Sequence, residues 1–338
     1  MSEIAIIGAG AWGTALSVVL ARSERHHIRL WAHEKEVCES IATHRANDKF
    51  LPGLSIPASV TPCNNFKEAL EGAAIVVSVM PSQHCRRLVG QMGPHLSPES
   101  MIVSATKGLE ENSLLRMTEV IEQTLMNAGA RVPRIGALSG PSFAVEAARG
   151  DPTAIAIASR DEELAARVQR EFSDASFRVY RNDDPTGVEL GGALKNTIAI
   201  AAGIAAGLGL GHNSIAALIT RGLAEMTRLV VACGGKPKTM AGLAGLGDLV
   251  LTCTGGLSRN RSVGVELGRG KKLPEILAGM HGMVAEGIFT TTAAVGLART
   301  HAVEMPITEQ MNAILHEGKT PRAALQELMT RSGKSETA

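Results

Sequence analysis

The chain has 338 residues, which is too long for one ordinary domain and suits two. Hydrophobic residues make up 45% of it, so it can build large cores, and because aromatic residues are only 3% those cores must be filled mainly by aliphatic side chains. The formal net charge is +1 and no sustained run of lysine and arginine occurs, which argues against nucleic acid or an anionic membrane surface as the main partner.

Cysteine and histidine usage favours a soluble cytoplasmic protein that holds no metal. The five cysteines are unevenly spaced without a CxxC pair, which fits a reducing compartment, and the ten histidines lack the spacing of metal ligands. The N-terminal segment does not resemble a signal peptide, and the longest weakly polar run, 198–210, is too short to cross a membrane. We therefore expect no membrane insertion.

From residue 3 to about 180, short apolar runs alternate with helical segments. Near-continuous apolar strands alternating with helices are typical of a doubly wound parallel sheet covered on both faces, as in a Rossmann-like α/β domain. The expected strands are 4–7, 28–31, 74–79, 101–104, 135–138, 153–158 and 177–179, and the clearest helices are 12–23, 113–128 and 161–172.

Beyond a polar turn cluster at 181–187, strand-like alternation disappears. We therefore predict two domains, 1–184 for dinucleotide binding and 185–338 for the substrate, the second being all-helical. Its expected helices are 188–206, 214–233, 259–269, 273–280, 289–299, 306–316 and 321–331, and residues 332–338 are expected to fray.

The segment IAIIGAGAWGTAL at 4–16 places a GxGxxG pattern between a strand and a helix. Gly8 permits a tight turn, Gly10 lets the backbone approach a pyrophosphate, and Gly13 allows close helix–strand packing. The positive end of the following helix favours an anion. This context favours a dinucleotide over a merely structural turn.

The residues after the second strand bear on which dinucleotide binds. NAD enzymes usually place an acid there for the ribose hydroxyls, whereas this chain has Ala32 and His33, with Glu34 one step later. A histidine accommodates a 2′-phosphate, with Arg22 or Arg29 as possible helpers. We expect NADP to be preferred and NAD to be accepted, although a strand one residue longer would present Glu34 instead.

Two segments follow strands whose carboxyl ends should face the ligand. Lys107 in SATKG could hold a substrate oxygen or the cofactor, or could be a solvated turn lysine. Gly140 and Ser142 in SGPSFA could offer donors to a substrate, although an ordinary Gly-Pro turn is the simpler interpretation.

The helix VELGGALKNTIAIAAGIAAG carries Lys195 and Asn196 inside an apolar segment. Gly191 and Gly192 lie one turn earlier and cost roughly 1 kcal/mol each relative to alanine, which makes sense if something lies against that face. A buried lysine can have a lowered pKa and transfer protons. The alternative is a lysine that extends to the surface, with glycines serving helix packing.

Two later segments supply a carboxylate and an anion site. Asp248 in AGLGDLV could pair with Lys195 or bind substrate hydroxyls, or could cap a helix. Ser258, Arg259 and Asn260 follow two glycines at an expected helix start, where arginine and N–H donors suit a phosphate. A capped surface turn is the alternative.

The segments GAGAWGTAL, SATKGLE, SGPSFA, ELGGALKN, AGLGDLVLTCT, SRNR and VAEGIFT resemble, in order, the motifs of bacterial NAD(P)-dependent sn-glycerol-3-phosphate dehydrogenase, over 4–316. The resemblance implies a Rossmann domain followed by a helical domain like that of 6-phosphogluconate dehydrogenase. It also implies Lys195 as proton donor and assigns the following contacts: substrate at Lys107, Gly140, Ser142, Lys195, Asp248, Ser258, Arg259 and Asn260; cofactor at Gly8, Gly10, Ala11, Trp12, Gly13, His33, Lys107, Ala144, Arg259, Val284 and Glu286. Ala11 stands where relatives often carry serine.

The resemblance implies reversible reduction of dihydroxyacetone phosphate to sn-glycerol 3-phosphate, a precursor of glycerophospholipids. A related dehydrogenase acting on another hydroxy acid should lack the segment Ser258-Arg259-Asn260, here called the SRN loop. A non-catalytic dinucleotide-sensing protein need not keep Lys107, Lys195 and Asp248 together. The alanine-rich helices after residue 197 suggest a homodimer.

Overall fold

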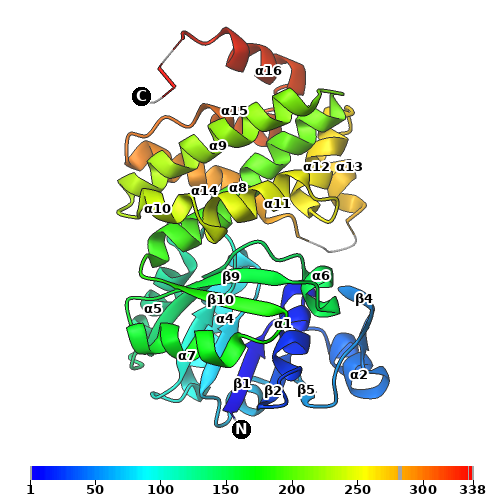
Figure 1. Ribbon diagram of the computed structural model, residues 1–338, viewed down its shortest axis with the longest axis vertical. Coiled ribbons are helices and arrows are strands. Elements are labelled where there is room, and N and C mark those ends of the chain that lie inside the picture. Colours follow the sequence, from blue (N-terminus) through cyan, green and yellow to red (C-terminus); the bar gives the residue numbers. More distant parts are fainter. Residues whose placement is uncertain (1, 281–283, 334, 337–338) are drawn as a thin grey trace.

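The structure is a computed structural model that describes residues 2–280, 284–333 and 335–336. Figure 1 shows a sheet flanked by helices, which contains the N-terminus, and a helical part stacked on it that ends in α16 (Pro321–Thr330). Part of the predicted frayed tail, namely 334 and 337–338, lies outside the described residues.

An eight-stranded sheet has the order β10-β9-β8-β7-β6-β1-β2-β5. From β1 the chain first adds β2 and β5 on one side of it and then β6, β7 and β8 on the other. The strand order therefore reverses beside β1, and open α/β sheets bind ligands at such a point. The strands are β1 (Ser2–Ile7), β2 (His26–Trp31), β5 (Val60–Cys63), β6 (Ile75–Ser78), β7 (Met101–Ser104), β8 (Arg134–Ser139), β9 (Thr153–Ala158) and β10 (Phe177–Asn182).

The predicted doubly wound parallel sheet is confirmed, with one departure at the edge formed by its last two strands. β9 pairs antiparallel with β8, opposing Leu138 to Ile157, and β10 runs parallel to β9. Between β8 and β9 lies only α6 (Ala144–Arg149), whose six residues span about 9 Å. With its flanking loops the connection covers 140–152, close to the minimum of about a dozen residues for a parallel crossover, so an antiparallel return is the simpler connection.

Edge elements were also missed by the sequence analysis. β5 contains Pro62, which argues against a central strand but is tolerated at the edge of a sheet, where β5 lies. A separate antiparallel pair, β3 (Ala46–Asn47) and β4 (Leu51–Ser55), lies outside the main sheet.

Both faces of the sheet are covered, because alternate residues of one strand enter different cores. Ile4 and Ile6 of β1 pack with α1, α2, α6 and α7, while Ala5 and Ile7 pack with α3, α4 and α5. These helices are α1 (Ala11–Ala21), α2 (Lys35–His44), α3 (Phe66–Leu70), α4 (Cys85–Met92), α5 (Met117–Asn127) and α7 (Glu162–Phe172).

The second part of the chain is helical, as predicted. Its elements are α8 (Pro185–Gly207), α9 (His212–Ala232), α10 (Pro237–Met240), a π-helical turn η3 (Leu243–Gly247), α11 (Asp248–Thr254), α12 (Arg259–Gly268), α13 (Leu273–Ala278), α14 (Glu286–Thr300), α15 (Pro306–His316) and α16. The short α10, η3 and α11 were not predicted.

Helix α8 starts three residues before its predicted start. Asp184 is its N-cap, accepting a bond from the Gly187 N–H at 2.8 Å, and Pro185 occupies the first helical position, where its missing N–H costs nothing. By length and composition α8 could span a membrane, but 89% of its most apolar window is buried inside the protein. It is the central core helix of the second part of the chain.

Candidate active site

The glycine loop between β1 and α1 has the geometry that its sequence predicted. Gly8 has a φ of +125°, and a Cβ there would overlap the Val79 carbonyl oxygen. A Cβ on Gly13 would overlap the carbonyl oxygen of Gly8, so this glycine lets α1 lie against the end of β1. Gly10 differs, because a Cβ there would meet nothing within 4 Å.

The first turn of α1 is suited to bind an anion. Gly10 is its N-cap and supplies no side-chain cap, and the turn contains no acidic residue. The N–H groups and the positive helix end therefore face the open space beside Gly10, an arrangement that favours an anion. Ala11 and Trp12 begin the helix, and the Trp12 ring lies 6.5 Å from that of Phe177.

The end of β2 presents His33 rather than an acid. β2 ends at Trp31, Ala32 is buried, and His33 is exposed, with its ring centroid 5.9 Å from that of Trp31. Glu34 is the N-cap residue of α2 and lies 3.2 Å from the Lys49 ammonium.

The two arginines considered as helpers for a 2′-phosphate lie elsewhere. Arg22 is at the opposite end of α1 from the glycine loop, where it donates to the Ala147 carbonyl at 2.7 Å. Arg29 contacts Glu3 near the start of β1.

The centre of the site is one carboxylate between two ammonium groups. Lys195 of α8 donates to Oδ1 of Asp248. Lys107, in the loop after β7, donates to Oδ2 of the same carboxylate at 2.7 Å. Asp248 is 1% exposed, so this contact joins the sheet and the helical part of the chain through a desolvated group. Of the roles considered for Asp248, pairing with Lys195 is the one observed.

The pKa of Lys195 is lowered from 10.5 to about 7. Burial is the main cause because it disfavours the ammonium, Lys107 acts in the same direction, and Asp248 opposes both. Cys253 is a further titratable group beside Lys195, and it is neutral because burial raises its pKa to about 12. Lys195 can therefore both donate and accept a proton near neutral pH.

Gly140 and Ser142 lie against the same group of charges. The Gly140 carbonyl accepts bonds from Lys107 at 3.3 Å and from the Ser142 hydroxyl at 3.0 Å. Gly140 has a φ of +151°, and a Cβ there would lie 2.8 Å from the Cα of Ile155. This turn therefore requires glycine for close backbone packing beside Lys107.

Protein, and not open space, lies against Gly191 and Gly192. A Cβ on Gly191 would be 2.5 Å from the Ala244 carbonyl oxygen, and one on Gly192 would be 2.5 Å from the Ser139 hydroxyl. The two glycines therefore serve packing, as in the alternative interpretation, against the backbone before Asp248 and the end of β8. Lys195 is buried, so the other half of that alternative, a lysine extending to the surface, is wrong.

The SRN loop (Ser258, Arg259 and Asn260) begins α12 and contacts Asn196, the residue after Lys195. Asn260 donates to the Asn196 side chain at 3.0 Å and accepts from the Gly287 N–H at 3.0 Å, which ties α8, α12 and α14 together. Ser258 is the N-cap of α12, and a hydroxyl that accepts the Arg261 N–H can still donate its own hydrogen. Arg259 is exposed and so can reach a ligand.

Glu286, the first residue of α14, joins the helical part of the chain to Ser82 of the sheet part. Its carboxylate accepts the Ser82 hydroxyl at 2.6 Å and the Ser82 N–H at 3.3 Å, and its pKa is raised because burial disfavours the charge. A Cβ on Gly108 would be 2.6 Å from the same hydroxyl, so the loop with Lys107 adjoins this contact. Val284 is half-buried two residues earlier, and Ala144 begins α6 against the core of the sheet.

Sequence reasoning missed two side chains that complete these contacts. The Thr252 hydroxyl accepts from Lys195 at 2.8 Å and donates to the Asp248 carbonyl at 2.6 Å. Thr252 lies four residues after Asp248, so the helix α11 would have revealed it. Ser82 gives no local signal, because its partner Glu286 is distant in the sequence.

Family models match nearly the whole chain. One described as the NAD-dependent glycerol-3-phosphate dehydrogenase N-terminus matches residues 3–165, and one described as the C-terminus matches 184–326. A glycerol-3-phosphate dehydrogenase [NAD(P)+] of Koribacter versatilis is 66% identical over 336 residues, covering 99% of each chain. One of Acidobacterium capsulatum is 55% identical over 339 residues, covering 99% of this chain and all of that one.

Solved structures agree with this assignment. A crystal structure of glycerol-3-phosphate dehydrogenase from Coxiella burnetii has a TM-score of 0.93 and 42% identity, covering 98% of this chain and 99% of that one. A ketopantoate reductase from Ralstonia eutropha has a TM-score of 0.60 at 17% identity, covering 96% and 99% of the two chains, which shows a shared fold alone.

The open space at Gly10 and the crowding at Gly13 predict opposite effects of alanine. Gly10→Ala should lower the melting temperature only slightly, because its Cβ meets nothing and only the N-cap preference for glycine is lost, and should weaken NADPH binding at least tenfold, about 1.4 kcal/mol. Gly13→Ala should lower the melting temperature markedly, because its Cβ overlaps backbone. Thermal unfolding and fluorescence titration with NADPH measure both effects, and full-strength NADPH binding by Gly10→Ala would contradict the placement of the pyrophosphate.

Proposed function

The chain belongs to the family of NAD-dependent glycerol-3-phosphate dehydrogenases, and we propose how its residues divide the reaction. It is an NAD(P)-dependent oxidoreductase that interconverts dihydroxyacetone phosphate and sn-glycerol 3-phosphate. The observation that carries our proposal is the buried Asp248 carboxylate held between Lys195 and Lys107.

Lys195 is the proton donor in the direction of reduction. The bound reduced nicotinamide supplies the hydride to the carbonyl carbon. Negative charge then develops on the carbonyl oxygen, where the Lys195 ammonium stabilises it and transfers a proton to it. In the reverse direction the neutral amine accepts the proton of the hydroxyl. Asp248 and Thr252 hold the amine in place throughout, through the contacts described above.

The SRN loop holds the substrate phosphate. Ser258, Arg259 and Asn260 combine a hydroxyl, a guanidinium fork and an amide at the first turn of α12, whose N–H groups also favour an anion. Asn260 is bonded to Asn196, the neighbour of Lys195, so a phosphate bound here is fixed relative to the proton donor. Lys107, Gly140 and Ser142 complete the substrate contacts.

The glycine loop would hold the cofactor, with Gly8, Gly10, Ala11, Trp12 and Gly13 around the pyrophosphate. His33 would face the ribose, and Lys107, Ala144, Arg259, Val284 and Glu286 would contact the rest of the cofactor. We propose that NADPH is preferred, because His33 follows β2 where an acid would select NAD and because Glu34 already lies beside Lys49.

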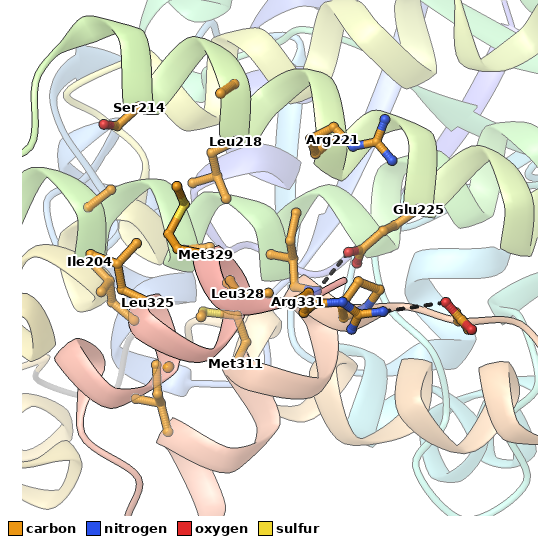
Figure 2. Close-up of a pocket in the computed structure, with 18 of the residues that line it drawn as sticks. Ile204, Ser214, Leu218, Arg221, Glu225, Met311, Leu325, Leu328, Met329 and Arg331 are labelled. Carbon is orange, nitrogen blue, oxygen red and sulfur yellow. Dashed lines mark hydrogen bonds and ion pairs between the residues drawn. The ribbon is translucent and has the colours of Figure 1, made fainter. Parts of the chain in front are cut away.

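We further propose a homodimer that buries a groove on the helical part of the chain. A cavity of about 1040 Å³ lies between α8, α9, α15 and α16 and contains none of the residues around Lys195. Figure 2 shows Leu218 of α9 facing Leu325, Leu328 and Met329 of α16 across it. Met329 is 77% exposed. An uncovered apolar surface of this kind is typical of a protein interface, and a second copy is the occupant we propose.

The remaining proposals concern the domain boundary, the location of the protein and the use of its product. The two domains are 1–184 and 185–338, with the joint between β10 and α8. The protein acts in the cytoplasm without membrane insertion, and its product supplies glycerophospholipid synthesis. A dehydrogenase for another hydroxy acid is disfavoured because such an enzyme has no use for the SRN phosphate loop.

The lowered pKa of Lys195 predicts that the rates of the two directions of the reaction depend on pH in opposite ways. Reduction needs the ammonium, so its rate should fall as pH rises through about 7, while oxidation of sn-glycerol 3-phosphate needs the neutral amine and should rise over the same range. Lys195→Met should lower kcat by at least a hundredfold in both directions and still bind NADPH. Initial rates of NADPH loss or formation across pH 5–9 measure this.

Unphosphorylated dihydroxyacetone is the substrate control for the same assay. It should react far more slowly than dihydroxyacetone phosphate, because the SRN loop then holds nothing. Comparable rates with both ketones would contradict the phosphate site, and an unchanged pH profile in Asp248→Asn would contradict the role of the carboxylate.

His33→Asp tests the cofactor preference. A carboxylate at this position should repel a 2′-phosphate and bind ribose hydroxyls, so the ratio of kcat/KM for NADPH to that for NADH should fall about tenfold. Glu34→Gln is the matched control and should leave the ratio unchanged. A larger effect of Glu34→Gln would show that Glu34, and not His33, faces the ribose.

Light scattering at micromolar protein tests the homodimer. The wild-type chain should have twice the mass of a monomer, and Met329→Glu should shift it toward the monomer by placing a charge in the groove. Met126→Glu, at a methionine 61% exposed on α5, is the control and should not change the mass. A monomeric wild-type chain would refute the proposal.

A further inference from the structure

Gly191 lies one helical turn before Lys195 and on the same face of α8. Its nearest neighbour is the backbone of η3, since a Cβ on Gly191 would be 2.5 Å from the Ala244 carbonyl oxygen and 3.2 Å from the Ala244 carbonyl carbon. Ala244 is 2% exposed, so this contact is dry. A backbone carbonyl cannot rotate away as a side chain can, and any Cβ at 191 must displace the turn itself.

The turn that rests on Gly191 leads directly to Asp248. η3 ends at Gly247, and Asp248 is the first residue of α11. The turn is also constrained from its other side, because a Cβ on Gly245 would overlap the Met240 carbonyl oxygen. With the turn fixed between α8 and α10, the place of Asp248 relative to α8 is fixed as well.

We propose that Gly191 is a positioning residue for Lys195: its missing side chain lets η3 lie on α8, and this contact sets the Asp248 carboxylate beside the ammonium. Lys195 and Gly191 share one helix, so a displacement of η3 changes the separation of carboxylate and ammonium directly. The inference uses the proposed function only in taking Lys195 as the proton donor.

Loss of this contact has a defined electrostatic consequence. Asp248 is the charged group that favours the Lys195 ammonium, with the Thr252 hydroxyl as a neutral acceptor, whereas burial and Lys107 oppose it and Cys253 is uncharged. Moving the carboxylate away therefore lowers the pKa of Lys195 further below its ordinary value. The lysine would then be deprotonated at neutral pH, where reduction requires a proton.

Gly191→Ala tests the proposal, with Gly207→Ala as its matched control. Gly207 ends the same helix, and its Cβ would overlap the Val265 carbonyl oxygen of α12, so both variants force a helix backbone away from α8. The readout is an NMR titration of the lysine Cε resonance assigned to Lys195 through its absence in Lys195→Met. This readout does not depend on turnover.

In Gly191→Ala the midpoint of the Lys195 titration should fall by about one pH unit, a tenfold change in the protonation equilibrium, and the pH limb of reduction should move with it. In Gly207→Ala the melting temperature should change while the Lys195 titration stays that of wild type. An unmoved titration in Gly191→Ala, or an equal shift in both variants, would overturn the proposal.

Gly245→Ala gives a second probe if Gly191→Ala does not fold, because it displaces η3 from its own side and leaves α8 unchanged. The same downward shift is expected, and its absence would overturn the proposal. If wild-type protein shows the lysine titration but no oxidation of NADPH by dihydroxyacetone phosphate, the proposed function fails while the titrations still decide the role of Gly191.

Discussion

The site depends on one desolvated carboxylate shared by two lysines. Taking Asp248 out of water is costly, and the cost is offset only because both carboxylate oxygens meet an ammonium. Lys107 comes from the sheet and Lys195 from the helical part, so the same charge that tunes the proton donor also holds the two parts of the chain together. Removing any one of the three charges leaves the others badly paired in a dry environment, and the arrangement must therefore form as a unit.

The fold supplies the geometry that this charge requires. The carboxyl ends of β1, β7 and β8 place the glycine loop, Lys107 and Gly140 along one edge of the sheet. Helix α8 starts beside that sheet and continues into the helical part, carrying Lys195 past the edge. Asn260 then bonds Asn196 of α8, so the proposed phosphate loop and the proposed proton donor are both held by this one helix.

The sequence predicted those features that depend on residues close together in the chain. The glycine loop, the strands of the central sheet and the long helices were found because their periodicity lies within a dozen residues, and Lys195 was found because a lysine beside two glycines is costly in an apolar helix. The antiparallel turn into β9 and the edge strand with Pro62 depend on partners distant in sequence. For the same reason Ser82 gave no signal, and the helix carrying Asp248 and Thr252 was hidden by the glycines before it. The ligand contacts proposed for Arg259, Val284 and Ala144 rest on resemblance.

The charges around Lys195 also explain why a lysine, and not a histidine, suits this reaction. Lys195, Lys107 and Asp248 sum to one positive charge, and Arg259 adds a second at the mouth of the phosphate loop. Under the proposed function, a phosphate dianion bound at 258–260 would stabilise the ammonium, so that Lys195 would be most fully protonated when substrate is present and a proton is needed. A histidine in the same dry place would begin with a lower pKa, and burial would lower it further, leaving it neutral. Lysine begins high enough that burial brings its pKa to about 7, where it can transfer a proton in either direction.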